Sequence, residues 1–404
     1  VYQAFQDPNH PLWVHHRVLW AENGDALSKI YAGTGALNSS FTRSGKKTLG
    51  GLLSDAAKSA GRMYINNFQD KSKQNVIDAL LGNMANQRPV TVFDPVLDSV
   101  TAELNGRVDE YSSSRDITVF AGTYNLNGKA PGESLIPWLF PDGEDREPDI
   151  FVIAFQEIVQ LTPQQILMTD PDKIRIWEAK IMDTIARRRD RKSRYILLRS
   201  EQLVGTALII LIKEELVNDV RLVEAATRKT GLKGMSGNKG GVAIRMDYFD
   251  TSLCFVTAHF AAGHSAYEER NADYWTITRG LSFARGKTIS SHDHVIWLGD
   301  FNYRIDLTND AVRSMVARND TAGLYARDQL RRSRDAGEVF PGYEEGAITF
   351  APTYKYDNGS DQYDSSEKQR IPAWTDRILY RGLGLRQLSY SRAELRTSDH
   401  RPVY

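Results

Sequence analysis

The chain has almost no cysteine. A single one, Cys254, stands among 404 residues, inside the apolar run 253–256. One thiol cannot build a disulfide framework, which excludes the disulfide-stabilised secreted scaffolds and favours a reducing compartment. Because its neighbours are apolar, we expect Cys254 to be a small buried hydrophobe on a strand.

Long apolar runs and a charge excess are also missing. No run reaches the ~20 apolar residues of a membrane-spanning helix, and the longest, 207–212, has the length of a buried strand. Asp7 and His10 interrupt any signal-peptide pattern. Lys plus Arg and Asp plus Glu each number 51, which argues against whole-chain electrostatic binding of nucleic acid. We therefore expect a cytoplasmic protein that contacts membranes only peripherally.

The chain changes character along its length. Residues 1–90 are polar and rich in Gly, Ser and Asn, with amphipathic helical pieces near 51–64 and 73–81 and no dense apolar core. Residues 91–114 are expected to be a linker. From 115 to 404, apolar strands alternate with helices, which predicts an α/β unit with a sheet core under helices. Strands are expected at 117–126, 149–158, 206–212, 240–247, 253–260 and 293–298, and helices at 172–191, 267–284, 310–319 and 322–334.

Polar residues follow several of these strands where each strand ends. Asn125 and Glu157 follow the first two strands, and His259 closes another. Asp300 and Asn302 come directly after the strand at 293–298. Strand ends are where the side chains of a sheet-based enzyme converge on a ligand.

These residue types suit hydrolysis of a phosphate ester with Mg²⁺. A hard cation prefers oxygen ligands, which Glu157, Asn125 and Asp399 could supply. A carboxylate at Asp300 could take a proton from the attacking water, with Asn302 orienting that water.

Two histidines complete the pattern. If protonated, His259 and His400 could stabilise the pentavalent phosphorus. Asp376, in the run 374–377, could orient one of those imidazoles and stabilise its charge.

Each of these residues alone has a plainer explanation. A lone Glu at a strand end is usually solvated, and Asp-x-Asn is more often turn chemistry. A His in an apolar segment is usually a hydrogen-bonded core residue, while Trp297 and Trp374 are packing residues first. Only the combination favours a catalytic site.

Eight motifs across 115–404 occur in a recognisable order. They are 122–128, 155–159, 237–242, 257–263, 297–304, 352–356, 372–378 and 398–403. This set resembles the inositol polyphosphate 5-phosphatases. Residues 1–90 resemble the C-terminal end of a Sac phosphoinositide phosphatase domain, notably in 19–25 and 31–36. The whole layout is similar to that of the synaptojanins and their fungal relatives.

The resemblance implies a deoxyribonuclease-I-like four-layer sandwich, with two mixed β-sheets flanked by helices. It implies that Glu157 is the principal Mg²⁺ ligand, with Asn125 and Asp399 close to the metal. Asp300 would activate water with help from Asn302, and water would attack directly, without a phosphoenzyme. His259 and His400 would contact the phosphoryl group, with Asp376 holding His400.

The resemblance also implies where substrate specificity lies. Tyr354, Lys355, Lys368 and Arg370 are similar to a cluster that binds the 4-phosphate next to the scissile 5-phosphate, a task that suits lysine and arginine. A solvated basic loop is the alternative for 355–370. Asn238 and Lys239 resemble a pair near the 1-phosphate, where neighbouring glycines permit close backbone approach. The substrate class is a phosphoinositide such as phosphatidylinositol 4,5-bisphosphate, or a soluble inositol phosphate.

The Gly-rich segment 229–235 suggests a contact with the bilayer. We hypothesise that Leu232 and Met235 enter the lipid while Lys229 and Lys233 meet its anionic head groups. The alternative is a mobile surface loop.

The Sac-like part departs from its family. Sac catalysis needs a Cys-x5-Arg loop, and the single cysteine lies in 115–404. We therefore expect residues 1–90 to be a remnant without a catalytic site, and the natural protein to continue past Tyr404.

Two rival functions remain open. An endonuclease of the same fold would share Glu157, Asp300 and Asn302, but the 4-phosphate cluster and the zero net charge favour an inositol phosphate over nucleic acid. A catalytically silent lipid-binding module predicts a degraded site, whereas every catalytic position is present.

Overall fold

The computed structural model describes residues 10–32, 36–44, 46–68, 95–143, 147–160, 170–189, 191–234 and 236–404. The chain divides into two compact units, Val1–Asp98 and Ser99–Tyr404. The predicted helix at 73–81 and the proposed membrane residue Met235 lie outside the described residues.

The described residues of the smaller unit are mostly helical and bury little apolar surface. It contains α2 (Pro11–Ala32), α3 (Ser39–Ser44) and α4 (Leu49–Phe68). Polar contacts tie its pieces together, since Asp25 accepts hydrogen bonds from Ala36 N and Arg43 Nη2. Among the apolar residues described in this unit, only Ala21 is buried. The absence of a dense apolar core from this described part agrees with the sequence.

Two helices, α6 (Pro95–Gly106) and α7 (Val108–Tyr111), lie where the sequence suggested a linker. Val96, Val100 and Leu104 recur at a helical spacing that the scattered polar residues obscured. None of the residues of these helices is buried. The boundary between the two units falls inside α6.

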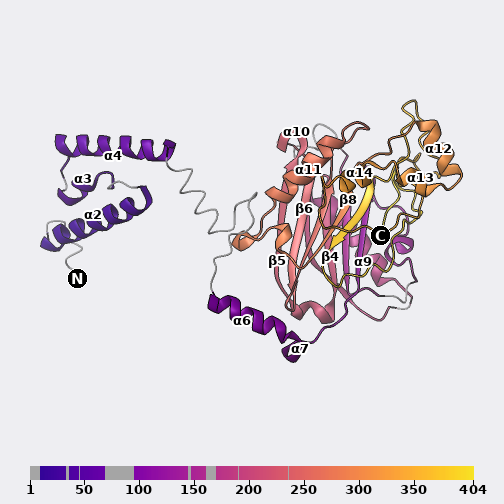
Figure 1. The fold of residues 1–404 in the computed structure, drawn as a ribbon, viewed down its shortest axis with the longest axis horizontal. Coiled ribbons are helices and arrows are strands. Elements are labelled where there is room, and N and C mark those ends of the chain that lie inside the picture. The colour runs from indigo at the N-terminus through magenta and orange to yellow at the C-terminus, as the bar shows by residue number, and fades with distance from the viewer. Residues whose placement is uncertain are drawn as a thin grey trace. The chain divides into compact units, whose positions relative to one another are not determined.

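Two mixed sheets form the centre of the larger unit (Figure 1). The first has the order β1-β2-β4-β3, with β1 and β2 parallel and the other pairs antiparallel. The second has the order β5-β6-β7-β8-β9, with only β7 and β8 parallel. The strands are β1 (Val119–Asn125), β2 (Ile150–Gln156), β3 (Tyr195–Leu203), β4 (Thr206–Lys213), β5 (Val220–Thr230), β6 (Ser236–Tyr248), β7 (Thr251–His259), β8 (His294–Asp300) and β9 (Asp376–Arg381).

Alternate residues of each strand face opposite layers. In β2, Val152 belongs to a core shared by the two sheets, together with Ile244 of β6 and Leu298 of β8. The neighbouring Phe151 and Ile153 face away from that core and join a cluster that includes residues of α9. Both faces of β2 are therefore covered, which explains why every residue of this strand is buried.

A third cluster covers the outer face of the second sheet. Cys254 and Trp297 pack there against Tyr274 and Ile277 of α11. The order helix, sheet, sheet, helix confirms the predicted four-layer α/β sandwich, and Cys254 is buried on a strand as expected. Besides α7 and most of α6, the α-helices described in this unit are α8 (Ile136–Leu139), α9 (Pro171–Ala186), α10 (Gly231–Gly234), α11 (Tyr267–Gly280), α12 (Asn309–Ala317), α13 (Thr321–Tyr325) and α14 (Gln329–Asp335).

The predicted helix at 322–334 is wrong as a single element. It is divided into α13 and α14, because the side chain of Asp328 accepts a hydrogen bond from Arg331 N and starts a new helix. Asp328 also pairs with the buried Arg377, which holds this break in place. No helix in the described part of the chain is both long enough and apolar enough to cross a membrane.

Candidate active site

The ends of four strands and the start of a fifth meet at one edge of the larger unit. In the second sheet, His259 of β7 is the register partner of Asp300 of β8, which is paired with Asp376 of β9. In the first sheet, Asn125 ends β1 beside Gln156 of β2. A hydrogen bond of 2.9 Å from Asn125 Nδ2 to Asp300 Oδ2 joins the two sheets at this edge.

Gly299 allows the two central strands of the second sheet to approach there. Its φ is +153°, and a Cβ at this position would lie 2.2 Å from the carbonyl oxygen of Ala258. Glu157 and Asn302 have left-handed backbones, with φ of 50° and 56°. Non-glycine residues rarely adopt this conformation, and such strain is concentrated at functional sites.

Asp300 is the central carboxylate of the site and is only 2% exposed. Its Oδ1 accepts a hydrogen bond from Asn302 N at 3.0 Å, and its Oδ2 lies 3.3 Å from His259 Nε2. Burial by itself raises the pKa of Asp300, but His259, His400 and Lys239 together hold it well below its ordinary value. The carboxylate is therefore ionised at neutral pH and can accept a proton.

His259 Nε2 is the point where several charges converge. Lys239 Nζ is hydrogen-bonded to it, and Glu157 Oε1 lies 3.8 Å away. Burial lowers the pKa of Lys239, although Asp300 and Glu157 oppose that shift. Lys239, predicted near the 1-phosphate, therefore lies beside His259 and close enough to Asp300 and Glu157 to interact with them electrostatically.

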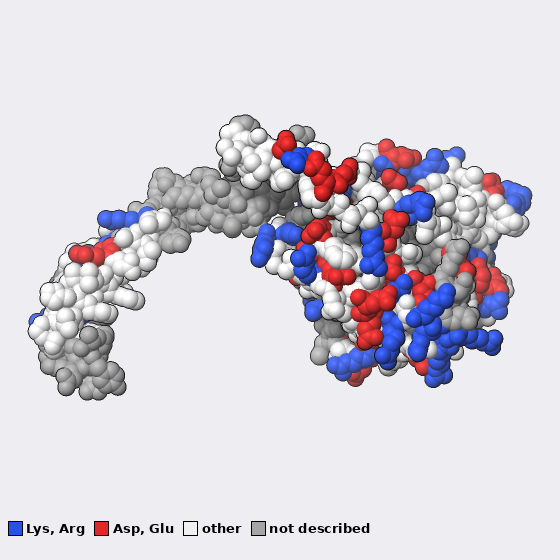
Figure 2. All heavy atoms as spheres, turned by 90° about the horizontal axis from the view of Figure 1, so that it is seen from below, with Lys and Arg blue, Asp and Glu red and all other residues white. Residues whose placement is uncertain are grey.

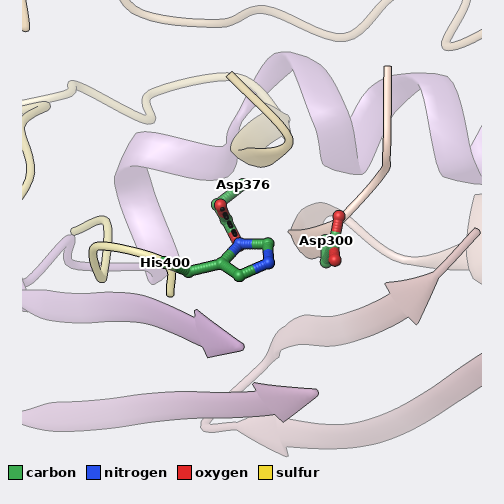
Figure 3. A group of neighbouring side chains, drawn as sticks. All are labelled: Asp300, Asp376 and His400. Carbon is green, nitrogen blue, oxygen red and sulfur yellow. Dashed lines mark hydrogen bonds and ion pairs between the residues drawn. The ribbon is translucent and has the colours of Figure 1, made fainter. Parts of the chain in front are cut away.

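Asp376 and His400 form a buried acid–base pair (Figure 3). His400 Nδ1 lies 2.9 Å from Asp376 Oδ2, which also accepts hydrogen bonds from Thr353 and Thr375. The other ring nitrogen is on the side of Asp300 in Figure 3. Burial lowers the pKa of His400, but the charges of Asp376, Asp300 and Asp399 raise it to about 10. His400 is therefore a cation at neutral pH.

Asp300, Asp376 and His400 form the only group of three or more possible metal-ligating side chains found within the described residues. The protonated imidazole of His400 has no free lone pair for a metal, although Asp376 Oδ1 has no hydrogen-bond partner among the described residues. We therefore interpret this group as proton-handling machinery rather than as a metal centre.

The oxygen donors predicted for Mg²⁺ lie beside this group. Glu157 keeps a quarter of its side chain exposed, whereas burial raises the pKa of Asp399 and the charge of Glu157 adds to that shift. Asn125 Oδ1 accepts a hydrogen bond from Asn127 N. Two carboxylates and an amide at one edge suit a hard divalent cation, which would offset the repulsion between Glu157 and Asp399.

The residues predicted for the 4-phosphate fall into two sets. The ring of Tyr354 packs on that of His400 with centroids 4.7 Å apart, and Lys355 Nζ lies 4.0 Å from Asp399 Oδ2. Lys368 and Arg370 are exposed on the following loop, with no side-chain contact to the site among the described hydrogen bonds and ion pairs. That loop is tied to Lys355 because Asp364 accepts from Arg370 N and donates its own N–H to Lys355 O.

The segment around 229–238 forms part of the same edge. Asn238 directly precedes Lys239, and its Oδ1 has no hydrogen-bond partner among the described residues. Leu232 is 67% exposed in the short helix α10, and Lys229 is exposed near the end of β5. Lys233 lies in α10 as well.

Sequence reasoning missed residues that support the site. Arg304 donates to Asn302 Oδ1 at 2.6 Å. Gln156 bridges the sheets, accepting from Thr123 and donating to Thr257 Oγ1. Arg304 and Gln156 both stand inside the recognised motifs, and their place two residues after Asn302 and directly before Glu157 was the available signal.

The part of the chain that carries the site residues matches a known protein family. A profile of Endonuclease/Exonuclease/phosphatase family 2 matches residues 122–404. Inositol-1,4,5-trisphosphate 5-phosphatase 1 of Schizosaccharomyces pombe is 51% identical over 399 residues, which cover 99% of this chain and 37% of that protein. Human Synaptojanin-1 is 41% identical over 451 residues, covering 96% of this chain and 28% of that protein. The chain spans about a third of the length of these relatives.

A solved structure extends the likeness to three dimensions. The inositol polyphosphate 5-phosphatase domain of SPsynaptojanin, in complex with inositol (1,4)-bisphosphate and calcium ion, is 48% identical and has a TM-score of 0.71. The match covers 77% of this chain and 89% of that domain. It confirms the deoxyribonuclease-I-like sandwich and the resemblance carried by the eight motifs. The chain therefore belongs to Endonuclease/Exonuclease/phosphatase family 2 and, within it, to the inositol polyphosphate 5-phosphatases.

Proposed function

We propose that this chain hydrolyses the 5-phosphate of phosphoinositides in an Mg²⁺-dependent reaction. Phosphatidylinositol 4,5-bisphosphate would become phosphatidylinositol 4-phosphate, and soluble inositol 1,4,5-trisphosphate is a second substrate. The observation that carries the proposal is the buried arrangement of Asp300 between His259 and Asn302, with the His400–Asp376 pair beside it.

The oxygen donors of the site fit a magnesium ion. Glu157 and Asp399 supply carboxylates and Asn125 supplies an amide oxygen, the donor types that Mg²⁺ prefers. When bound, the ion would neutralise negative charge that develops on the phosphoryl and leaving oxygens. The related solved domain contains calcium, another hard cation with the same preference for oxygen.

Asp300 would act on the attacking water, and the two histidines would act on the phosphoryl group. Asp300, which stays ionised, accepts a proton from the attacking water while Asn302 holds Asp300 by its backbone N–H. The water oxygen forms its bond to phosphorus as the bond to the ring oxygen breaks. The leaving ring oxygen takes up a proton from solvent to become the product hydroxyl, and Asp300 returns to solvent the proton that it accepted. His400, protonated by virtue of Asp376, and His259 donate hydrogen bonds to the phosphoryl oxygens, where charge accumulates in the transition state.

The edge around the site would recognise the rest of the substrate. Tyr354 and Lys355 would bind the 4-phosphate, with Lys368 and Arg370 reaching it from their loop. Asn238 would contact the 1-phosphate, close to Lys239. A basic cluster selects a phosphate dianion because ammonium and guanidinium groups form charge-assisted hydrogen bonds with its oxygens.

The direct test is release of phosphate across a panel of inositol lipids and head groups, with and without Mg²⁺. We expect release only from 5-phosphorylated compounds and only with the metal.

An endonuclease would instead nick plasmid DNA under the same conditions. The formal net charge is zero, and Figure 2 shows acidic and basic side chains both occurring across the drawn face of the larger unit, with Lys and Arg gathered toward one side. DNA nicking without phosphate release would overturn the proposal.

We further propose a cytoplasmic location with peripheral membrane contact and a role in phosphoinositide turnover and membrane traffic. Leu232 is exposed beside the catalytic edge, with Lys229 nearby, as a shallow bilayer contact requires. Leu232→Glu should reduce turnover of lipid in vesicles several-fold while leaving soluble inositol 1,4,5-trisphosphate unaffected. Equal rates on the vesicles would refute this contact. Residues 1–90 would be the end of a Sac domain with no catalytic site of their own.

A further inference from the structure

Arg304 is a buried arginine directly behind the site, only 7% exposed. It holds one residue at two points: its Nε donates to Asn302 O at 3.0 Å, and its Nη2 donates to Asn302 Oδ1 at 2.6 Å. The Nδ2 group of Asn302 donates to Phe260 O. Because its oxygen and its nitrogen are both held, the side-chain amide of Asn302 has one orientation.

Among the described residues, the charge of Arg304 has no direct carboxylate partner. It takes part in none of the ion pairs found among the described residues, although a buried guanidinium is normally paired. Its guanidinium carbon instead lies 4.5 Å from the centre of the Tyr354 ring, a cation–π contact. Tyr354 in turn packs against His400.

These contacts place Arg304 between two parts of the site. One part is Asp300 and Asn302, which act on water in the proposed function. The other is Tyr354 and His400, which face the substrate phosphates. The loop of Tyr354 is about fifty residues farther along the chain than Arg304, so the ring depends on such a tertiary contact for its position relative to Asn302.

We propose that Arg304 is a positioning residue that couples 4-phosphate recognition at Tyr354 to the water-activating pair Asp300 and Asn302. The inference rests on the proposed function. A single rigid, planar group bonds Asn302 at two points and has its central carbon over the Tyr354 ring, so the bound 4-phosphate and the attacking water are held in register. Lysine can carry the charge but offers neither the two-point edge nor the flat face.

The test compares Arg304→Lys with Arg327→Lys, a substitution at an exposed arginine between α13 and α14. Turnover is measured in Mg²⁺ on inositol 1,4,5-trisphosphate and inositol 1,5-bisphosphate. Binding of inositol 1,4-bisphosphate and inositol 1-phosphate is measured by calorimetry. Thermal unfolding of each variant shows how much protein is folded.

We expect Arg304→Lys to reduce the preference for the 4-phosphorylated compound about tenfold in kcat/KM, and to reduce the binding preference as well. Its kcat should also fall on both substrates, because Asn302 is released. Tyr354→Leu should reduce the same preference, and the double variant should reduce it no further. Arg327→Lys should match the unsubstituted chain.

The coupling is refuted if Arg304→Lys lowers both rates equally and leaves both preferences unchanged, as simple loss of folded protein does. It is also refuted if the effects of Arg304→Lys and Tyr354→Leu multiply in the double variant. Failure of the proposed function has a different signature: the unsubstituted chain would release no phosphate, and the calorimetric preference would then decide the coupling alone.

Discussion

The two sheets contribute different chemistry to one site. The first sheet supplies Asn125 and Glu157, an amide and a carboxylate whose oxygens can bind a metal ion. The second supplies Lys239, His259 and Asp300, which lie in contact: Lys239 is hydrogen-bonded to His259, and both residues help to lower the pKa of Asp300. The first half therefore suits a metal ion and the second suits proton transfer.

Few polar contacts join the two halves near the site. The side chain of Asn125 donates a hydrogen bond to Asp300, and that of Gln156 donates one to Thr257 of β7. The reaction needs the groups of both sheets at fixed distances from one another. These two hydrogen bonds therefore help to set the geometry of the site. Substitutions of the site residues in the second sheet should therefore stop the reaction, whereas those of the site residues in the first should change the metal concentration that the reaction needs.

The largest effect is expected for Asp300→Asn in the second sheet. An amide cannot accept the proton of the attacking water, so kcat should fall by about 10² to 10⁴ while ligand binding persists. Single-turnover phosphate release and calorimetry measure the two quantities. Asp310→Asn, at an exposed carboxylate in the first turn of α12, is the matched control. Retained turnover in Asp300→Asn would contradict the assignment of the base.

Glu157→Gln should weaken metal binding by the residues of the first sheet. Loss of one carboxylate charge should raise the Mg²⁺ concentration needed for half-maximal rate by about tenfold or more, with activity partly restored at high metal. A titration of rate against Mg²⁺ tests this, with Glu269→Gln, on an exposed face of α11, as control. An unchanged metal requirement would move the ion away from the first sheet.

Asp376→Asn should change the pH dependence. In the unsubstituted chain the pKa of His400 is about 10, so its proton remains in place through neutral and mildly alkaline pH. Without the negative partner, burial lowers that pKa, and activity should be lost at a pH several units lower as the solution becomes alkaline. A pH–rate profile measures the shift.

The same pair also makes a pH-dependent contribution to stability. Since the folded-state pKa of His400 is raised from 6.5, its contribution is complete below about pH 6.5 and is lost as pH rises toward 10. Denaturant titrations at pH 6 and pH 9.5 should therefore differ less in Asp376→Asn than in the unsubstituted chain. Equal differences would show that the pair does not hold the proton of His400.

The smallest effect on rate is expected for Gln156→Met, which removes the hydrogen bond between Gln156 of the first sheet and Thr257 of the second. Thr123 and Thr257 would each lose a buried hydrogen-bond partner, which should cost about 1–3 kcal/mol in the free energy of unfolding. Urea denaturation measures the loss. An unchanged stability together with a large loss of kcat would mean that Gln156 acts on the chemistry rather than on the joining of the sheets.

The fold was readable from apolar runs, but unevenly. The strand at 206–212 and its neighbours in the two cores are buried on both faces, so hydrophobicity alone marks them. The strands β3 and β5 were missed because they are partly exposed, with side chains such as Arg199 and Glu224 interrupting the apolar pattern. Strand β9 was hidden because its first residues, Asp376 and Arg377, are charged although buried.

The site was readable at the strand ends and in the motifs, but not its internal connections. Nothing in the sequence indicates that Asn125 reaches Asp300 across 175 residues. The placement of Lys239 against His259, rather than at the rim, also depends on how the strands β6 and β7 pair. Such contacts are set by sheet register and packing, which local sequence does not encode.

The most direct test follows the phosphorus and the oxygen in one reaction. The chain is incubated with Mg²⁺ and inositol 1,4,5-trisphosphate in ¹⁸O-labelled water, and the products are identified by mass spectrometry. We predict inositol 1,4-bisphosphate and free phosphate that carries one oxygen from water, because water activated by Asp300 attacks the 5-phosphate directly. Loss of the 1- or 4-phosphate, or an inositol product that carries the ¹⁸O, would contradict the account.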